Sequence, residues 1–334
     1  MLQRFVVVAD LQAEAARALG DWSGAEAGCV THCTASAITL SIAACMAGSD
    51  AASIAQLPDA AGMRCRVPLL GPHQVNYGHS ILQAVRLAGA QPVVCDGLSA
   101  LRAALAEGGA ACVLAVESHL AVGSGTALTR ELVDAAHAAG VPLVLDGAAQ
   151  DWRVRELLAT GADLVLLSAQ KYLCAPTAGL VLGRPTLVVA VDAQHGGIGR
   201  AMKPSKEALA GVIAALQWRG AADPTAWQAA QQRKVDAVWA AASRWPGVQA
   251  SREVDPQGNG FERLWLQLDA ATGGPDAASV IRRLMDGDPV VAVAPHRAAQ
   301  GCVGLELTGV DESELPELCR LLEKALSEPG SRPR

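Results

Sequence analysis

Aromatic residues are scarce in this chain of 334 residues, which contains seven Trp, two Tyr and two Phe. The core therefore has to be built mainly from Ala, Val, Leu and Ile, and hydrophobic residues make up 51% of the sequence. Aliphatic side chains of this kind suit helices packed on a buried parallel sheet. The length is sufficient for one large domain or for two of ordinary size.

Other shortages disfavour several classes of protein. The chain has 27 Lys and Arg against 33 Asp and Glu, a net charge of −6, so we expect no large basic surface for nucleic acid. The nine Cys are scattered without a C-x-x-C pair, which argues against a metal site or a disulfide framework and favours a reducing cytoplasm. No uncharged apolar run has membrane-spanning length, and the N-terminus lacks a signal-peptide pattern. We expect a soluble cytoplasmic protein.

Short apolar runs alternate with amphipathic stretches from about residue 30 to 185. This alternation is typical of an open, mostly parallel sheet with crossover helices. We expect strands at residues 66–70, 92–95, 111–116, 142–145, 164–167 and 180–183, and helices at 35–47, 79–88, 98–106, 129–139 and 153–159.

The rest of the chain has a different pattern. Two long helices are expected at 205–218 and 225–242, followed by a smaller α+β unit. Within that unit the sequence predicts strands at 262–268, 290–293 and 304–307 and helices at 277–285 and 312–325. We divide the chain into an N-terminal segment (1–25), a large domain (26–222) and a small C-terminal domain (223–328).

Two expected strands end in polar residues with evident chemistry. The run VPLVLD ends in Asp146, and ADLVLLS ends in Ser168, three residues before Lys171. In open α/β sheets, ligands bind at the carboxyl ends of the strands. An acid and a lysine from neighbouring strand ends fit pyridoxal 5′-phosphate (PLP): the lysine forms a Schiff base with it, and the carboxylate keeps its pyridine nitrogen protonated. Ser168 could donate to the cofactor phosphate.

A possible phosphate site opens the Ala-rich stretch that begins near residue 34. Backbone N–H groups at a helix N-terminus can bind a phosphate, and small or hydroxylated side chains leave them accessible. Thr and Ser are also common in an ordinary helix cap. Together with the lysine motif, the pattern favours a phosphate cup formed by Cys33, Thr34 and Ala35.

Three segments carry a resemblance to a known family. The stretches VESHLAVGSGTALTRELVDAAHAAGVPLVLDGAAQ and SAQKYLCAPTAGLVLG resemble fold-type I PLP enzymes. The segment GGIGRAMKPSKEALAGVIAALQ is similar to the branch that contains bacterial selenocysteine synthase and D-glucosaminate-6-phosphate ammonia-lyase. The likeness extends roughly from Glu26 to Leu322. It implies the aspartate-aminotransferase fold, with a large domain built on a mostly parallel sheet and a small C-terminal α+β domain.

The resemblance also implies roles for particular residues. Lys171 falls at the Schiff-base lysine, Asp146 at the partner of the pyridine nitrogen and Ser168 at the phosphate-binding serine. Ser118, at the end of VLAVES, falls where such enzymes place a hydrogen-bonding group near the ring oxygen. Gln150, after the Asp146 strand, completes this part of the expected cofactor site.

The loop GPHQVNYGHS follows the strand RVPLL, where related enzymes place a residue that stacks on the cofactor ring. We assign this role to His73, with His79 as the alternative; surface histidines in a polar loop would look the same. His119, next to Ser118, is a candidate for substrate binding.

The Gly-rich segment at residues 194–203 supplies two further candidates. Gly197 permits close backbone approach to the cofactor, and Arg200 offers a fork suited to a carboxylate. Related enzymes often pass this loop into the neighbouring subunit's site, which implies a homodimer or a dimer-based oligomer. A flexible linker between domains is the alternative. Arg297, in APHRAAQ, is another candidate for the substrate carboxylate.

Three classes of function remain. The resemblance supports a PLP-dependent lyase in which Lys171 removes the α-proton of a small amino acid or amino-sugar acid, and loss of the β-substituent yields a 2-oxo acid and ammonia. An aminotransferase, racemase, aldolase or selenium or sulfur transferase on the same scaffold is the second class. Against transamination, VGLEL lacks the arginine that many aminotransferases carry nearby. A non-enzymatic PLP-binding descendant is the third, although Asp146, Ser168 and Lys171 argue against it.

Overall fold

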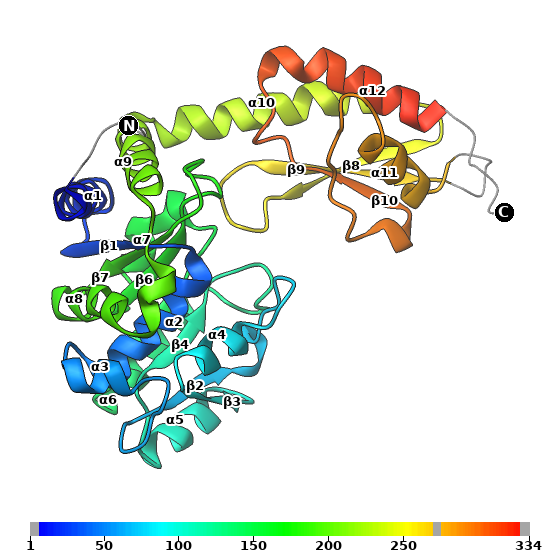
Figure 1. The fold of residues 1–334 in the computed structure, drawn as a ribbon. Helices are drawn as coiled ribbons and strands as arrows, with labels where there is room; N and C mark the ends of the chain where they lie inside the picture. Colours follow the sequence, from blue (N-terminus) through cyan, green and yellow to red (C-terminus); the bar gives the residue numbers. More distant parts are fainter. Residues whose placement is uncertain (1–6, 270–274, 328–334) are drawn as a thin grey trace. The chain divides into compact units, whose positions relative to one another are not determined.

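The computed structural model describes residues 7–269 and 275–327 (Figure 1). The chain divides into two compact units, with the boundary between Ala221 and Ala222. Each unit has a sheet and a hydrophobic core of its own, and the two are described separately.

The first unit is built on a five-stranded sheet in the order β1-β7-β6-β5-β4. Strands β4, β5 and β6 are parallel, and β7 runs antiparallel to both β6 and β1. A parallel pair, β2 and β3, approaches β4 through a bridge between Arg66 and Ala110. The strands are β1 (Ala27–Thr31), β2 (Arg66–Leu70), β3 (Gln91–Cys95), β4 (Val113–Val116), β5 (Leu143–Asp146), β6 (Leu164–Ser168) and β7 (Gly179–Gly183).

Helices cover both faces of this sheet. Because successive side chains of a strand point to opposite faces, Val144 packs with the helices of one layer and Leu145 with those of the other. Small alanines allow α2 to be buried on nearly every side. The first layer contains α2 (Thr34–Ala47), α3 (Ala51–Gln56), α4 (Ile81–Leu87) and α8 (Pro185–Ala193), and the second contains α1 (Val8–Ser23), α5 (Leu98–Ala106), α6 (Thr126–Ala138), α7 (Val154–Leu158) and α9 (Lys206–Ala221).

The second unit is a small α+β structure. Its antiparallel sheet has the order β10-β9-β8, and three helices pack against it. Buried Lys234 donates hydrogen bonds to the carbonyl groups of Leu307 and Val310, both at 2.9 Å. The elements are α10 (Pro224–Ala242), β8 (Val248–Val254), β9 (Glu262–Leu268), α11 (Ala277–Met285), β10 (Cys302–Leu305) and α12 (Leu315–Ser327).

One expected strand is wrong. Residues 290–293 form no strand, because the N–H of Val291 donates to the carbonyl of Leu284 at the end of α11 (2.8 Å) and is not available to a ladder. A single bridge between Ala294 and Gly304 connects this segment to β10. Elements α1, α3, α8, β1 and β8 were not expected from the sequence. The six strands expected between residues 66 and 183 are confirmed to within two residues at each end.

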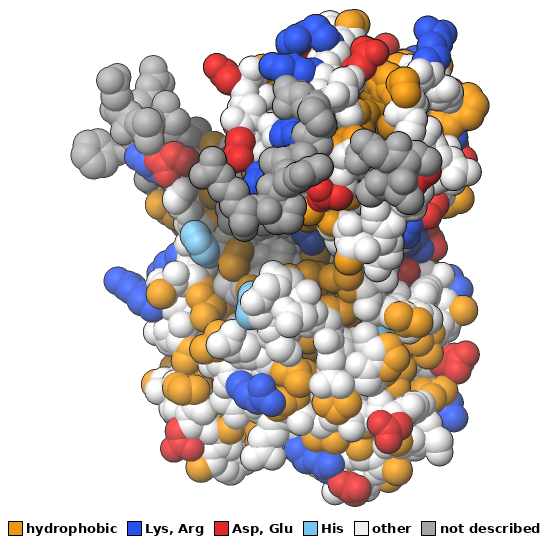
Figure 2. Space-filling model, turned by 90° about the vertical axis from the view of Figure 1, so that its right-hand side faces the viewer, with side chains coloured by type: hydrophobic (Ala, Val, Ile, Leu, Met, Phe, Trp, Pro, Cys, Tyr) orange, Lys and Arg blue, Asp and Glu red, His pale blue; other side chains and the backbone are white. Residues whose placement is uncertain are grey.

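On the face drawn in Figure 2, Lys and Arg side chains are interspersed with Asp and Glu among hydrophobic and uncharged groups. The described part of this face has no continuous basic surface. Within residues 7–269 and 275–327, no helix combines the length and apolar character that a membrane span requires.

Candidate active site

The carboxyl edge of the first sheet gathers the polar residues that the sequence singled out. Thr31 pairs with Gly179, and Gly179 pairs with Ser168. Asp146 pairs with Leu166, two residues before Ser168, so Asp146, Ser168 and Thr31 project from the same face of the sheet. This is the face covered by α2. The strand pairing alone therefore brings a carboxylate and two hydroxyl groups to one place.

Asp146 is a buried carboxylate with an unfilled hydrogen-bonding position. The residue is 1% exposed, and its Oδ1 accepts a hydrogen bond from the N–H of Ala148 at 3.1 Å. Its Oδ2 is buried and has no partner within the described residues. Burial raises the pKa of Asp146 to about 6, and the positive charge of Lys171 opposes the rise. A cationic donor placed at Oδ2 would lower this pKa and so stabilise the ionised form.

Lys171 lies in an exposed position at the same edge, in the loop after β6. Its Nζ is 5.4 Å from the centroid of the Tyr77 ring. Partial burial raises the pKa of the Tyr77 phenol, the Asp146 charge adds to the rise, and the Ser118 hydroxyl opposes it. Lys171, Asp146, Ser118 and Tyr77 thus form one electrostatic neighbourhood.

Tyr77 was not among the site residues expected from the sequence. His73, to which the stacking role was assigned, is 1% exposed, and its Nδ1 accepts a hydrogen bond from the N–H of Val116 at 3.4 Å. His79 is exposed. Tyr77, from the same loop, is the aromatic side chain that lies against Lys171. The rarity of tyrosine could have drawn attention to Tyr77, since the chain contains two Tyr.

The buried position of His73 determines its protonation. Burial lowers the pKa of the imidazole to about 4, so the ring is neutral at neutral pH. Because Nδ1 accepts from Val116, the proton of the neutral ring lies on Nε2. That atom is buried and lacks a partner in residues 7–269 and 275–327. His73 therefore places an unused donor beside β4, the strand paired with Asp146.

The N-terminus of α2 has the form of an anion site. Cys33 caps the helix: its Sγ accepts from the N–H of Ser36 at 3.5 Å, and the Ser36 hydroxyl accepts from the N–H of Cys33 at 2.9 Å. The N–H groups of Thr34 and Ala35, at the first two positions, have no acceptor within a helix. A Cβ at Gly179 would clash with the carbonyl of Cys33, so glycine permits this close approach.

Two hydroxyl groups near this helix end are unused. The Oγ of Ser168, a residue 1% exposed, and the Oγ1 of Thr34 are buried without a hydrogen-bond partner in the described part of the chain. The N–H of Ser168 donates to the carbonyl of Ala148 at 3.0 Å, which fixes the end of β6 beside the segment after Asp146.

Gln150 is fixed by an ionic network. Its side chain is 2% exposed, and its Oε1 accepts from Arg153 at 2.9 Å. Arg153 also binds Glu156 at 2.8 Å and lies 3.5 Å from the buried carboxylate of Glu117. Burial raises the pKa of Glu117, and Arg153 opposes the rise.

The remaining expected site residues lie in different surroundings. Gly197 packs against α3, since an added Cβ would come within 2.8 Å of the carbonyl oxygen of Ile54. Arg200 is exposed in the turn Ile198–Met202, which reaches the α2 cap through a hydrogen bond from the N–H of His32 to the carbonyl of Met202 at 2.9 Å. His119 is exposed and follows Ser118.

Arg297 belongs to the second unit and is already engaged there. Its guanidinium binds both carboxylate oxygens of Glu253, at 2.6 and 2.9 Å, and lies 4.0 Å from the centroid of the Trp265 ring. An incoming carboxylate would have to compete with Glu253 for Arg297.

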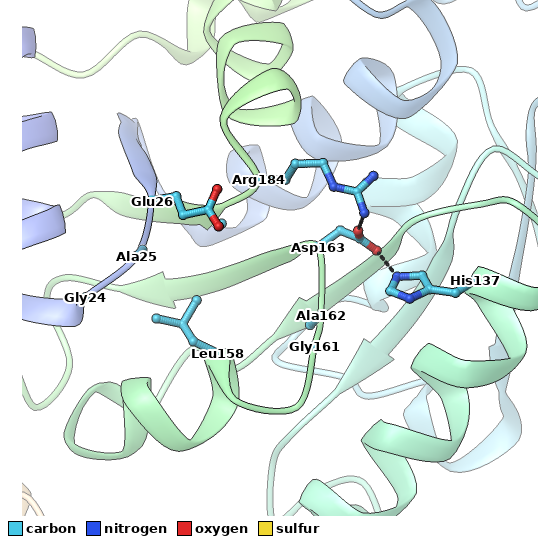
Figure 3. A pocket seen from close by; sticks show the side chains of 10 residues that line it. Gly24, Ala25, Glu26, His137, Leu158, Gly161, Ala162, Asp163 and Arg184 are labelled. Carbon is cyan, nitrogen blue, oxygen red and sulfur yellow. Dashed lines mark hydrogen bonds and ion pairs between the residues drawn. The ribbon is translucent and has the colours of Figure 1, made fainter.

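A cavity of about 410 Å³ lies at the opposite edge of the sheet (Figure 3). Asp163 lies there at the amino end of β6, and its side chain is 2% exposed. The carboxylate accepts hydrogen bonds from the N–H of Leu143 at 2.7 Å and from His137 Nε2 at 2.9 Å. It also forms an ion pair with Arg184. Because its carboxylate is fully paired by three separate elements, we interpret this cluster as structural.

Asp163→Asn should lower the free energy of unfolding by about 1–3 kcal/mol, since a buried charge-assisted network loses its charge. Urea unfolding at neutral pH measures the change. His137→Gln is the control, because the His137 side chain is 43% exposed and its loss should matter little. Equal stability of Asp163→Asn and the unsubstituted protein would contradict the structural interpretation.

The residues at the carboxyl edge fit PLP. A buried carboxylate with one free oxygen suits a pyridinium N–H, and an exposed lysine beside it suits the aldehyde carbon. The first N–H groups of α2 and the Ser168 hydroxyl suit a phosphate. In the described residues no group of three or more His, Cys, Asp or Glu side chains could hold a metal ion.

Two curated proteins are related along almost the whole chain, while no family model matches it. The D-glucosaminate-6-phosphate ammonia lyase of Salmonella typhimurium is 32% identical over 316 residues, which cover 93% of this chain and 84% of the relative. The 5′-C-glycyluridine monooxygenase-decarboxylase of a Streptomyces species is 30% identical over 321 residues, which cover 94% of this chain and 80% of the relative.

Solved structures agree with this relationship. The structure of a D-glucosaminate-6-phosphate ammonia-lyase superposes with a TM-score of 0.85 at 31% identity, covering 97% of this chain and 88% of that one. Sphingomonas wittichii serine palmitoyltransferase, at 15% identity and a TM-score of 0.60, shares the fold over 95% of this chain and 76% of its own. The expected fold and the PLP cofactor are thereby confirmed, and the chain belongs to the fold-type I PLP-dependent enzymes, in the family of D-glucosaminate-6-phosphate ammonia-lyase.

Proposed function

We propose that the protein releases ammonia and a 2-oxo acid from a small amino acid or amino-sugar acid that carries a leaving group at Cβ. The observation that carries this proposal is the buried Asp146 carboxylate with the Lys171 amine beside it at the carboxyl edge of the sheet. The ammonia-lyase relative, 32% identical along 93% of the chain, supports this reaction over others on the same fold.

Lys171 and Asp146 have different roles in the proposed reaction. PLP, when bound, supplies an acceptor for the electron pair left when a substrate Cα–H bond breaks. Lys171 Nζ holds the cofactor until the substrate displaces it, and is then the base that takes the Cα proton. Asp146 holds a proton at the pyridine nitrogen. For a β-hydroxylated substrate, the water lost from Cβ balances the water consumed when ammonia is released.

Buried polar groups that lack partners among the described residues support the following cofactor contacts. The N–H groups of Thr34 and Ala35, with the Cys33 turn and the Ser168 hydroxyl, bind the phosphate. Tyr77 lies where it can contact the ring, and Ser118 is placed beside it.

Exposed residues are the proposed contacts for the substrate. Arg200 is the first candidate for the substrate carboxylate, because its planar fork matches a carboxylate and its side chain is exposed near the α2 cap. His119 is also exposed at the end of β4. Arg297 is the weaker candidate, since Glu253 already occupies its guanidinium.

The assembly is proposed to be a homodimer, or an oligomer built from such dimers, in which the segment at residues 194–203 approaches the neighbouring site. Closed C₂ dimers are the commonest assembly of soluble proteins. A protein that is monomeric by light scattering and fully active at the same dilution would contradict the proposed dimer.

Nine free cysteines support a reducing cytoplasm as the location. The further likeness to bacterial selenocysteine synthase rests on the segment at residues 196–217.

A second reaction has support from one relative. The monooxygenase-decarboxylase is 30% identical along 94% of this chain, so an oxygen-dependent decarboxylation is the second candidate reaction. That chemistry requires dioxygen as a co-reactant, whereas ammonia release does not.

A panel of D- and L-amino acids together with D-glucosaminate-6-phosphate tests the reaction. We expect ammonia and a 2-oxo acid without any added amino acceptor. Dependence on an added 2-oxo acid would show an aminotransferase, and solvent-deuterium exchange alone would indicate a racemase. Oxygen consumption with release of carbon dioxide would favour the second reaction. Any of these three results would contradict the lyase proposal.

A further inference from the structure

Arg219 is a buried arginine close to the residues of the proposed site. It lies near the end of α9, and its side chain is 2% exposed. The guanidinium forms an ion pair with Asp151 and donates to the backbone carbonyl of Tyr172. Its central carbon is 3.7 Å from the centroid of the Trp152 ring. An arginine that is almost fully buried needs hydrogen-bonding and ionic partners of this kind, because burying an unpaired charge is strongly disfavoured.

The two partners of Arg219 belong to the two segments that carry the chemistry. Asp151 is the residue after Gln150, in the segment that begins at Asp146. Tyr172 is the residue after Lys171. One guanidinium therefore binds the segment following β5 and the segment following β6 together. We propose that Arg219 is a positioning residue that holds the Lys171 loop in register with the Asp146 segment.

The Lys171 loop has a conformation that needs such support. The N–H of Cys174 donates to the carbonyl of Lys171 at 3.0 Å, and the N–H of Ala175 donates to that of Ala169 at 2.9 Å, so the chain reverses sharply after the lysine. Cys174 has a φ of 57°, in the left-handed region that non-glycine residues seldom adopt. Such backbone persists where the surroundings over-determine it. The contact between Arg219 and the Tyr172 carbonyl lies in the middle of this turn.

The geometry of the contact favours arginine in particular. The NH1 group of Arg219 binds the Asp151 carboxylate while NH2 binds the Tyr172 carbonyl, so both arms of the fork are used. A lysine has one ammonium group and cannot reproduce this planar, two-directional arrangement. The flat guanidinium also packs on the Trp152 ring, which a lysine would do less well.

The opposite charges of Arg219 and Asp151 cancel, so the pair adds no net charge near Lys171. Burial lowers the pKa of Arg219, and the Asp151 carboxylate opposes this. Burial raises the pKa of Asp151 to about 6, and Arg219 opposes the rise. The ion pair is neutral as a whole, so its effect on Lys171 is positional.

This inference rests on the proposed attachment of PLP to Lys171, and its test separates the two. Arg219→Lys retains the charge and loses the fork. With the PLP-loaded protein we expect kcat to fall by about 10²-fold, the effect of a misplacement of about 1 Å at a reacting group. KM should change far less than kcat. Borohydride labelling of Lys171 should slow, the visible band of the bound cofactor should shift, and amide hydrogen exchange at residues 172–175 should accelerate.

The control is Arg66→Lys. Arg66 also binds a carboxylate and a backbone carbonyl, Glu107 at 2.7 Å and Gly108 at 3.0 Å, at the start of β2. It should leave kcat, the visible band and exchange at residues 172–175 unchanged. Asp151→Asn provides a second variant that removes the ion-pair charge while leaving Arg219 and the Tyr172 carbonyl in place. It should reproduce the direction of the Arg219→Lys effect to a smaller extent.

Several results would overturn the inference. If Arg219→Lys keeps the kcat of the unsubstituted enzyme, the arginine positions nothing. If kcat falls while labelling rate, visible band and exchange stay unchanged, Arg219 acts elsewhere. In either case PLP attachment to Lys171, and with it the proposed function, would stand. If the unsubstituted protein itself is not labelled at Lys171, both the proposed function and this inference fail.

Discussion

Lys171→Ala should lower kcat by about 10⁴-fold or more, because it removes the amine that we propose holds PLP and then takes the Cα proton. The protein should still fold, since the Lys171 side chain is exposed. It should also still bind PLP through the α2 N-terminus and Asp146. Borohydride followed by peptide mapping should label Lys171 in the unsubstituted protein and label nothing in the variant.

Lys171→Arg separates charge from reactivity. Arginine retains a positive group near Asp146 and the Tyr77 ring, but it stays protonated and can serve neither as nucleophile nor as base. It should therefore be as inactive as Lys171→Ala. Lys206→Ala is the matched control, because Lys206 lies at the start of α9 and pairs with Glu207 at 3.8 Å. A labelled lysine other than Lys171, or substantial turnover by Lys171→Arg, would contradict the assignment.

The proximity of Asp146 and Lys171 could be predicted from the sequence, because each lies at or shortly after the end of a strand too apolar to face solvent. Both ends of strands β5 and β6 lie within one residue of the expected positions. The parallel pairing of these strands brings Asp146 and Ser168 to one face of the sheet. Strand ends are determined by local pattern and by sheet geometry, both of which a single sequence contains.

The position of Tyr77 against Lys171 could not be predicted in this way. His73, His79 and Tyr77 belong to one loop after β2, and which side chain turns towards Lys171 depends on contacts with other elements. His73 is turned inwards by the N–H of Val116, a residue 43 positions away. Arg219 was missed for a similar reason, since its partners Asp151 and Tyr172 lie 68 and 47 positions away.

The elements missed along the chain also have physical causes. β1 has the short, mixed sequence AGCVT, with no clear alternation, and it is defined by its pairing with β7. α1 packs on β1 and α9, so its helical structure depends on tertiary partners as well as on propensity. The valine-rich segment at 290–293 has strand propensity, but one competing hydrogen bond to the end of α11 prevents a ladder.

Asp146→Asn should act in opposite directions on activity and on stability. Activity should fall by about 10²- to 10⁴-fold, because breaking the proposed buried ion pair between Asp146 and the pyridinium removes about 3–5 kcal/mol. In the protein without PLP, the same change removes a buried carboxylate that folding disfavours in its charged form. The Oδ1 contact with the N–H of Ala148 can be kept by the amide oxygen. Steady-state kinetics and urea unfolding measure the two effects.

The stability effect has a definite pH dependence. Burial raises the pKa of Asp146 from its usual value to about 6 in the folded protein. Below about pH 4 the group is protonated in both states, and it affects stability little. Between about pH 4 and 6 the unfolded chain ionises first, so stability falls as pH rises. A rise of about two pKa units corresponds to about 3 kcal/mol, which Asp146→Asn should recover at pH 8 but not at pH 4.

Two comparisons isolate this effect. Asp151 also has a pKa raised to about 6, so the unsubstituted protein loses stability over the same pH range for a second reason, and the difference between variant and parent is the quantity to measure. Asp163→Asn, the same substitution at the other edge of the sheet, should destabilise at neutral pH because its carboxylate is fully paired. If Asp146→Asn also destabilises the PLP-free protein at pH 8, its carboxylate is satisfied without the cofactor, and the assignment of Oδ2 to the pyridinium is wrong.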